Sequence, residues 1–297
     1  MTQTMALIRR NAKLFFKDKG MFFTALITPG ILLVLYATFL GNIYRDSFQQ
    51  GLPEFVKLSE ELLDGLVGGQ LISSLLAVSC ITVAFCSNIL MVQDKANGSI
   101  KDLRITPVKT SALSAGYYIA SLISTLLVCF VAAGLCLIYV AVTGWYMTAA
   151  DVALLFLDVV VLSLFGTALS SVIHFFLSTQ GQIAAVGSIV SAGYGFICGA
   201  YMPIDTFSEG LQKAVSFLPG TYGTSLVRHH AMRGAFQQML DEGAPKELVR
   251  GIQESLDFYP ELLGKEVSVG GMYAILGGSV VVLMGIFLLQ NLSKKKA

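Results

Sequence analysis

Long apolar segments alternate with short polar ones along nearly the whole chain. A helix needs about 20 apolar residues to cross the hydrocarbon layer of a membrane. Six runs meet this length, and they cover residues 21–41, 70–92, 112–142, 152–176, 182–202 and 268–290. The pattern therefore predicts an all-α polytopic membrane protein with six transmembrane helices, in a single transmembrane domain over residues 1–297.

Charge is distributed unevenly between the segments that join these runs. Hydrophobic residues make up 55% of the chain and charged residues only 13%, where an average soluble domain is roughly a quarter charged. The N-terminal segment, the second loop and the C-terminal tail carry twelve basic residues against three acids, and the opposite side carries eight against fifteen. Because cytoplasmic segments are enriched in Lys and Arg, we expect a multi-pass protein of the plasma (inner) membrane with both termini cytoplasmic.

Residues 1–20 are amphipathic rather than apolar. Met5, Ile8 and Phe15 cluster on one arc of a predicted helix, and Arg9, Arg10, Lys13 and Lys17 take the other. Such a helix lies in the headgroup plane with its cations on anionic lipid. We therefore predict an N-terminal interfacial helix before the first crossing.

The region between the last two crossings, residues 203–267, is expected to be external. Its first part is only moderately polar and is rich in proline and glycine, including Pro203 and Pro219. This mixture fits short re-entrant helices that dip into the outer leaflet, where irregular backbone persists only if protein buries it. A plain surface loop is the alternative.

The loop at residues 94–109 combines charge with a short helical pattern. Ser99 and Asp102 have the spacing of a weak capping box, and Pro107 ends the helix. Ile100 and Leu103 then share one side of about two turns. A helix this short is not stable alone, so we expect either the bilayer surface or a docking protein to support it.

Two blocks of sequence carry a family resemblance. The first is Gly-Ser-Ile-x-x-Leu-x-x-Thr-Pro-Val at residues 98–108, directly after the second apolar run. The second combines Pro203, the segment at 217–222 and the Leu-Val-Arg at 226–228. In this order they resemble the membrane subunits (permeases) of type-2 ATP-binding-cassette (ABC) exporters, including the drug and antimicrobial exporters. Leu218 and Gly220 depart from the family pattern, which usually has Asn and Leu there.

The resemblance implies roles for these blocks and for the partners of the chain. It implies a cytoplasmic coupling helix that contacts a separate ABC ATPase subunit through Ser99, Ile100, Asp102, Leu103, Arg104, Thr106 and Pro107. It implies a re-entrant segment that includes Pro203, Pro219, Thr221, Tyr222 and Arg228. It also implies that residues 1–20 are a connecting helix, that the partner ATPase binds ATP and Mg²⁺, and that a second permease copy or a paralogue completes the transporter.

The fifth crossing carries small residues at every fourth position, namely Gly187, Ser191, Gly195 and Gly199. Small residues at this spacing let helices approach closely in lipid. Contacts within one subunit explain the stripe as well as a dimer interface does. The family resemblance favours the dimer interface and the substrate path.

Asp158 is an ionisable residue inside a predicted crossing, where such residues usually face a cavity or a partner. It is a candidate contact for an ion or a cationic substrate. Alternatively, its carboxylate reaches external water or bonds a neighbouring hydroxyl. His229 and His230 follow Arg228 and have the chemistry of a pH sensor, although the sequence favours a solvated basic cluster.

The chain lacks the motifs of an enzyme. Gly264-Lys265 is followed by Glu266, so no phosphate-binding loop for ATP is formed, and there is no His-Glu-x-x-His. We expect no catalytic residue, metal, cofactor or nucleic-acid partner for this chain. The predicted function is export of a hydrophobic or amphipathic molecule such as a drug, an antimicrobial peptide or a lipid-like compound. The alternatives are export of a lipid-linked polysaccharide and a non-transporting scaffold or sensor subunit.

Overall fold

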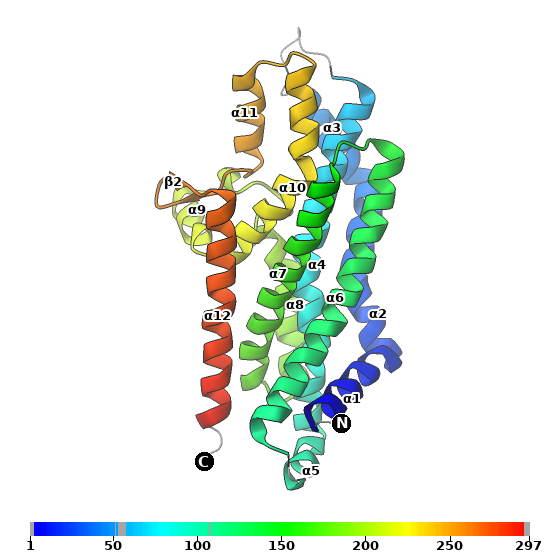
Figure 1. Ribbon diagram of the computed structural model, residues 1–297, viewed down its shortest axis with the longest axis vertical. Coiled ribbons are helices and arrows are strands. Elements are labelled where there is room, and N and C mark those ends of the chain that lie inside the picture. Colours follow the sequence, from blue (N-terminus) through cyan, green and yellow to red (C-terminus); the bar gives the residue numbers. More distant parts are fainter. Residues whose placement is uncertain (1–2, 51, 53–57, 107, 294–297) are drawn as a thin grey trace.

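The computed structural model describes residues 3–50, 52, 58–106 and 108–293. These residues form an elongated bundle of long helices (Figure 1), as an all-α protein requires. The elements are α1 (Gln3–Lys17), α2 (Lys19–Leu35), a π-helical turn (Tyr36–Leu40), α3 (Gly41–Gln50), α4 (Glu60–Ala96), α5 (Ser99–Ile105), α6 (Thr110–Thr143), α7 (Ala149–Phe176), α8 (Gln180–Ile197), a 3-10 turn (Ile204–Thr206), α9 (Glu209–Ser216), α10 (Pro219–Asp241), α11 (Lys246–Ser255), β1 (Glu261–Leu262), β2 (Lys265–Glu266) and α12 (Val269–Ser293).

Helix α4 is the centre of the bundle. It packs against α2, α6, α7, α8 and α10, and most of its residues are buried. Helix α12 lies against α7 and α10, and α1 lies against α6. The outward side chains of α2, α6 and α12 are mostly large and apolar. This is the pattern of helices that face lipid.

Side-chain caps fix where several helices begin. The Ser59 hydroxyl accepts a hydrogen bond from the Leu62 N–H and starts α4. Thr148 with Asp151, and Thr179 with Gln182, form reciprocal capping boxes at the starts of α7 and α8. Each cap satisfies N–H groups that have no acceptor within the helix.

Five helices of the described residues are long and apolar enough to cross a membrane, where the sequence predicted six. They are Lys19–Gln50, Glu60–Ala96, Thr110–Thr143, Ala149–Phe176 and Val269–Asn291. The predicted crossing at 182–202 corresponds to α8, which is not among them. It has only 18 residues, about 27 Å of helix, and Gln180 and Gln182 in its first turn make it less apolar.

Two crossings extend well beyond the predicted boundaries. The run expected at 21–41 continues through the π-helical turn to Gln50, and the run expected at 70–92 begins at Glu60. At 1.5 Å per residue the 37-residue α4 is about 55 Å long. Its first turns therefore project beyond the hydrocarbon layer, and the acidic residues Glu60 and Glu61 lie in them.

The N-terminal helix packs on the protein more than its amphipathic pattern predicted. Its buried stripe is Leu7, Asn11 and Phe15. Leu7 sits so close to Gly116 of α6 that a Cβ at Gly116 would lie 2.8 Å from the Leu7 Cβ. Met5, expected on the same apolar arc as Phe15, is exposed, as are Leu14 and Phe16, and these apolar side chains of the helix are available to lipid.

The two ends of the bundle are different in character. Helices α1 and α5 and the C-terminal end of α12 lie at one end, and α3 and α11 lie at the other (Figure 1). Helix α8 connects the end of α7 to the α9 region. It is too polar to count among the five candidate crossings.

Candidate functional site

Helix α5 forms the tip of one end of the bundle (Figure 1). Its apolar side chains divide into two groups. Ile100 and Leu103 are half-buried and pack against the main core of the chain. Ile105 is 84% exposed. The side chain available to a partner is therefore Ile105, whereas the sequence pattern had assigned that position to Ile100 and Leu103.

The start of α5 differs from the predicted capping box. Gly98 occupies the N-cap position with φ +80°, and no side chain bonds the first turn. Ser99 is already the first helical residue because the chain turns directly out of α4 at Asn97. The positive φ favours glycine at this turn. The expected cap by Ser99 with Asp102 is wrong.

The other end of α5 is closed by Thr106. Thr106 has an extended backbone, and its hydroxyl donates to the Leu103 carbonyl at 2.6 Å. Pro107, which was predicted to stop the helix, lies outside the described residues, as does the side chain of Arg104. Lys101 and Asp102 are exposed. Among its described side chains, the helix thus presents two charged ones and one large apolar one outward.

Two adjacent residues at the end of α4 attach the base of α5 to neighbouring helices. Arg10 of α1 forms an ion pair with Asp94 at 2.8 Å, and Tyr117 of α6 donates to the same carboxylate. The hydrogen bond to Asp94 raises the pKa of Arg10. Lys95 donates to the carbonyls of His174 and Leu177, at 2.8 and 3.2 Å, where α7 ends.

Asp94 and Lys95 are adjacent in the chain, and together they connect the base of α5 to α1, α6 and α7. Lys95 donates to carbonyls in the last turn of α7 and at the residue that follows it, so the ends of α4 and α7 are held together. These links could not be predicted from the sequence, because periodicity within a helix does not show which residue of another helix it meets. The only sequence signal was an acid followed by a base just before Gly98.

The second block of predicted residues lies where α9 turns into α10. Pro219 is the first residue of α10, where its missing N–H costs no helical hydrogen bond. The Thr221 hydroxyl donates to the Val215 carbonyl at 3.2 Å, and the Tyr222 hydroxyl donates to the Ser216 carbonyl. Both acceptors lie at the end of α9. Thr221 and Tyr222 are buried, so this turn is not the plain surface loop considered as an alternative.

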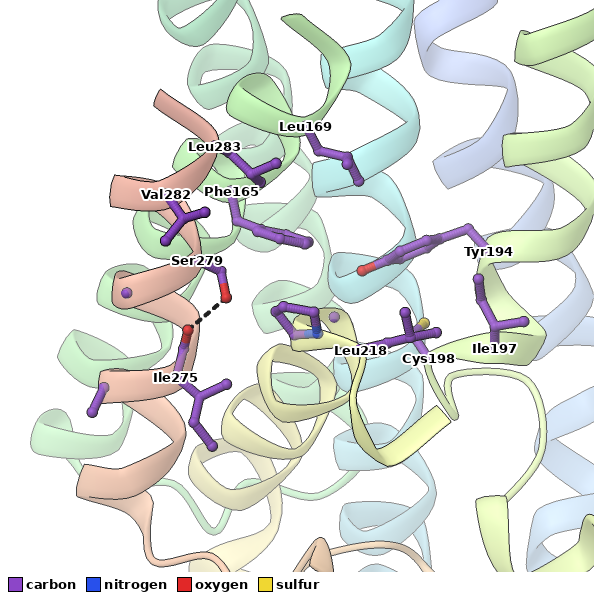
Figure 2. A pocket seen from close by; sticks show the side chains of 14 residues that line it. Phe165, Leu169, Tyr194, Ile197, Cys198, Leu218, Ile275, Ser279, Val282 and Leu283 are labelled. Atoms are coloured by element: carbon purple, nitrogen blue, oxygen red, sulfur yellow. Dashed lines mark hydrogen bonds between the residues drawn. The ribbon is translucent and has the colours of Figure 1, made fainter. Parts of the chain in front are cut away.

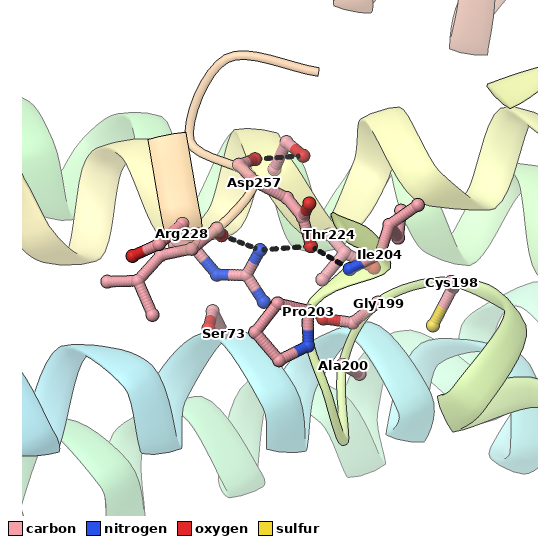
Figure 3. Close-up of polar contacts among 12 residues, drawn as sticks. Ser73, Cys198, Gly199, Ala200, Pro203, Ile204, Thr224, Arg228 and Asp257 are labelled. Atoms are coloured by element: carbon pink, nitrogen blue, oxygen red, sulfur yellow. Dashed lines mark hydrogen bonds and ion pairs between the residues drawn. The ribbon is translucent and has the colours of Figure 1, made fainter. Parts of the chain in front are cut away.

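Arg228 connects four segments of the same region (Figure 3). Its side chain is 1% exposed. It donates to Gln70 Oε1 of α4 at 3.1 Å, to the Gly199 carbonyl at 2.7 Å and to the Leu256 carbonyl, and it lies 3.8 Å from the Asp257 carboxylate. Burial raises the pKa of Asp257 to about 6, and Arg228 opposes that rise.

Pro203 belongs to the same cluster (Figure 3). It precedes the 3-10 turn, and the N–H of the next residue, Ile204, donates to Asp257 Oδ2 at 2.8 Å. The Ser225 hydroxyl donates to the Asp257 carbonyl. The predicted residues Pro203 and Arg228 are therefore brought together through Asp257, a residue that the sequence analysis did not single out.

A comparison with known protein families identifies the family of this chain. The family model of the ABC-2 type transporter matches residues 2–231. The chain belongs to the ABC-2 type transporter family. It is the transmembrane permease component of an ABC transporter and not its ATPase, and permeases of this family normally pair with an ABC ATPase subunit. No curated protein matches the chain.

The small-residue stripe of this permease serves two different purposes. A Cβ at Gly195 would lie 2.2 Å from the Tyr201 ring, and Gly199 has φ +70° and supplies a carbonyl to Arg228. These two glycines are thus explained by contacts within the chain. Gly187 has open space beside it and Ser191 is exposed. Contacts within the chain therefore explain the C-terminal half of the stripe.

Asp158 lies in a closed polar cluster. Its carboxylate accepts hydrogen bonds from His230 Nδ1 at 2.6 Å and from the Tyr273 hydroxyl. It is fully buried, so the interpretation in which it reaches external water is wrong, and it bonds a neighbouring hydroxyl instead. The cluster joins α7, α10 and α12.

The two histidines are not a solvated basic cluster. His230 is buried against Asp158, and His229 is half-buried. Burial lowers the pKa of His229 to about 4, so this side chain is neutral at physiological pH. The pairing of His230 with Asp158 was missed because 72 residues separate them in the chain.

We expect Asp158→Asn to be tolerated and Asp158→Leu to be harmful. An asparagine can still accept from Tyr273 and donate to a neutral His230. Leucine leaves both groups buried without a partner, at about 1–3 kcal/mol each. Thermal unfolding of the purified protein is expected to give a near-normal midpoint (Tm) for Asn and a clearly lower one for Leu. Loss of transport by the Asn variant at normal Tm would instead show that the charge of Asp158 contacts an ion or the substrate.

Proposed function

We propose that this permease exports a hydrophobic or amphipathic molecule outward, driven by an ABC ATPase subunit that docks on α5. The observation that carries the proposal is the position of Ile105. This large apolar side chain is 84% exposed on α5, the short charged helix at the tip of the bundle. A short helix of this kind needs a partner to be stable. ATP and Mg²⁺ are bound by the ATPase and not by this chain.

The contacts at the base of α5 support a route for the coupling. When the ATPase pair closes on ATP, it pushes on α5. The push reaches α1 through the Arg10–Asp94 ion pair and α7 through Lys95. These are hydrogen-bonded contacts that move as a unit with α4, so motion at α5 becomes motion of several crossings.

A second copy of the chain, or a paralogue, completes the path. Helix α8 has α4 as its main neighbour, and its outer face is both exposed and built from small residues such as Ala185, Ser188 and Ala192. Small residues favour close helix packing in lipid. In this arrangement α8 acts as the sixth crossing of each subunit, even though it is less apolar than the other five.

The cargo is assigned from the surface beside that face. Outward residues of α2 and α8 are large and apolar, including Phe23, Ile27, Ile31 and Ile189. Such a lining fits a drug, an antimicrobial peptide or a lipid-like molecule better than a polar glycan. Export of a lipid-linked polysaccharide is the second candidate. Measured ATP-dependent transport of any molecule by the complex would exclude a non-transporting scaffold or sensor.

The proposed orientation has a direct test in single cysteines. The native cysteines within the described chain are buried or half-buried, so an added surface cysteine dominates labelling. A cysteine at Lys101 should react with a membrane-impermeant thiol reagent only after the cells are opened, and one at Glu247 should react in intact cells. The unsubstituted protein measures the background. The reverse pattern would place α5 outside and remove the coupling assignment.

A further inference from the structure

A second feature of the permease is an apolar cleft between α7, α8 and α12 (Figure 2). Its volume is about 580 Å³, within the range of about 300–1,000 Å³ typical of sites for small organic ligands. The walls come from Phe165 and Leu169 of α7, Tyr194 of α8, and Ile275 and Val282 of α12. The start of α10 closes one side.

The cleft opens toward the lipid-facing surface of the protein. Ile197, Leu218 and Val282 line it and are each exposed by 40% or more. Helices α7 and α12 are two of the candidate crossings. The medium at the mouth is therefore the bilayer, and the molecules present there in excess are lipids.

One polar group in the wall has no partner. Tyr194 is only 8% exposed, and its hydroxyl has no hydrogen-bond partner among the described residues. Figure 2 shows the hydroxyl directed into the cleft toward Phe165. The other hydroxyl, of Ser279, already donates to the Ile275 carbonyl. A buried hydroxyl without a partner is costly, so an oxygen acceptor in the cleft would be stabilised there.

Glycine at position 220 makes this arrangement possible. A Cβ at Gly220 would lie 2.3 Å from the Tyr194 hydroxyl oxygen, so any larger residue would displace the tyrosine. Tyr194 lies in the last turn of α8, which ends at Ile197. The hydroxyl is thus near the C-terminal end of α8. The ester carbonyl at the head of a glycerolipid acyl chain is an oxygen acceptor of the kind that this hydroxyl lacks.

From these observations we infer that the cleft binds one acyl chain of a membrane glycerolipid, with the ester carbonyl accepting a hydrogen bond from Tyr194. The bound chain fills the space between α8 and α12, which lack substantial direct packing. The site is separate from the proposed dimer interface. Ala185 is exposed and precedes Tyr194 by nine residues, which is two and a half helical turns, so the two lie on opposite faces of α8.

The test uses the full-length protein in nanodiscs that contain a phosphatidylethanolamine with a photoreactive diazirine near the start of one acyl chain. After illumination, cross-linked peptides are mapped by mass spectrometry. We expect cross-links at the cleft residues to exceed those at Val281, a fully lipid-facing residue of α12 outside the cleft, by at least fivefold. Equal cross-linking at both places means ordinary surrounding lipid and overturns the proposal.

Two substitutions sharpen the result. Gly278 lines the cleft and has open space at its Cβ, so Gly278→Leu fills the cleft without a clash. It should reduce cleft cross-linking at least fivefold. Gly277→Leu is the matched control, because Gly277 also has open space but does not line the cleft. Tyr194→Phe should reduce cleft cross-linking about threefold, and unchanged cross-linking in both Gly278→Leu and Tyr194→Phe contradicts the site.

Discussion

Replacing Ile105 by aspartate is expected to separate the permease from its ATPase subunit while leaving membrane insertion intact. Ile105 is 84% exposed and outside the crossings, so the free permease loses no packing. In the complex the aspartate would be buried without a partner, which costs about 3 kcal/mol or more. Since about 1.4 kcal/mol is a factor of ten in affinity, binding should weaken by roughly a hundredfold. The ATPase should no longer co-purify, and its activity should no longer be stimulated.

Two neighbouring substitutions control for charge and for folding. Lys101→Ala changes an exposed charge on the same helix and should be nearly silent, because solvated charges contribute little to binding. Leu103→Asp is a less specific test, since Leu103 packs against the core of the chain and the variant should also loosen α5 itself. Full ATPase binding by Ile105→Asp would make α5 an ordinary surface turn.

Replacing Arg228 by methionine is expected to cause the largest loss of stability of any single change considered for this chain. The guanidinium satisfies Gln70 and two carbonyls and lies beside the Asp257 carboxylate. Methionine has a similar length but no donor, so the buried acceptors lose their partner. The Asp257 carboxylate keeps the Ile204 N–H but loses the nearby positive charge. The loss should be about 3–5 kcal/mol. It should appear as a lower Tm of the purified protein and as poor yield in the membrane.

Arg250 offers a matched control. It pairs with Glu254 and Glu266 on the surface, where all three side chains are well exposed. Exposed ion pairs contribute about 0–1 kcal/mol. Arg250→Met should therefore leave the Tm nearly unchanged. Equal Tm values for the two variants would mean that Arg228 does not hold α4, α10 and the segments after α8 and α11 together.

The sequence predicted the crossings well where apolar character continues without interruption. The runs at 112–142 and 152–176 lie inside α6 and α7, and the run at 268–290 begins one residue before α12. Boundaries were missed where polar residues belong to the same helix, as at Glu60, which Ser59 caps. Helix α8 shows the opposite case. Its glutamines and glycines lower its apolar character, so composition alone does not decide whether it crosses.

The functional residues were predicted less completely than the family. Thr221, Tyr222 and Arg228 came from a motif, and each makes the buried contacts that explain its residue type. The side-chain partners of Arg228 were not predicted, because Asp257 and Gln70 are distant from it in the chain and carry no periodic signal. Burial is also a property of the packed structure, which is why Leu103 and not Ile105 seemed to be the docking residue.

Site-specific photo-cross-linking from Ile105 tests the central claim that α5 is the docking point of the ATPase. A photoreactive amino acid at this position, in the permease co-expressed with its ATPase, should cross-link to the ATPase subunit. The same amino acid at Leu263, which is also exposed but belongs to the segment between β1 and β2, should give no such product. Cross-links from Ile105 to lipid alone, or ATPase products from Leu263, would contradict the account.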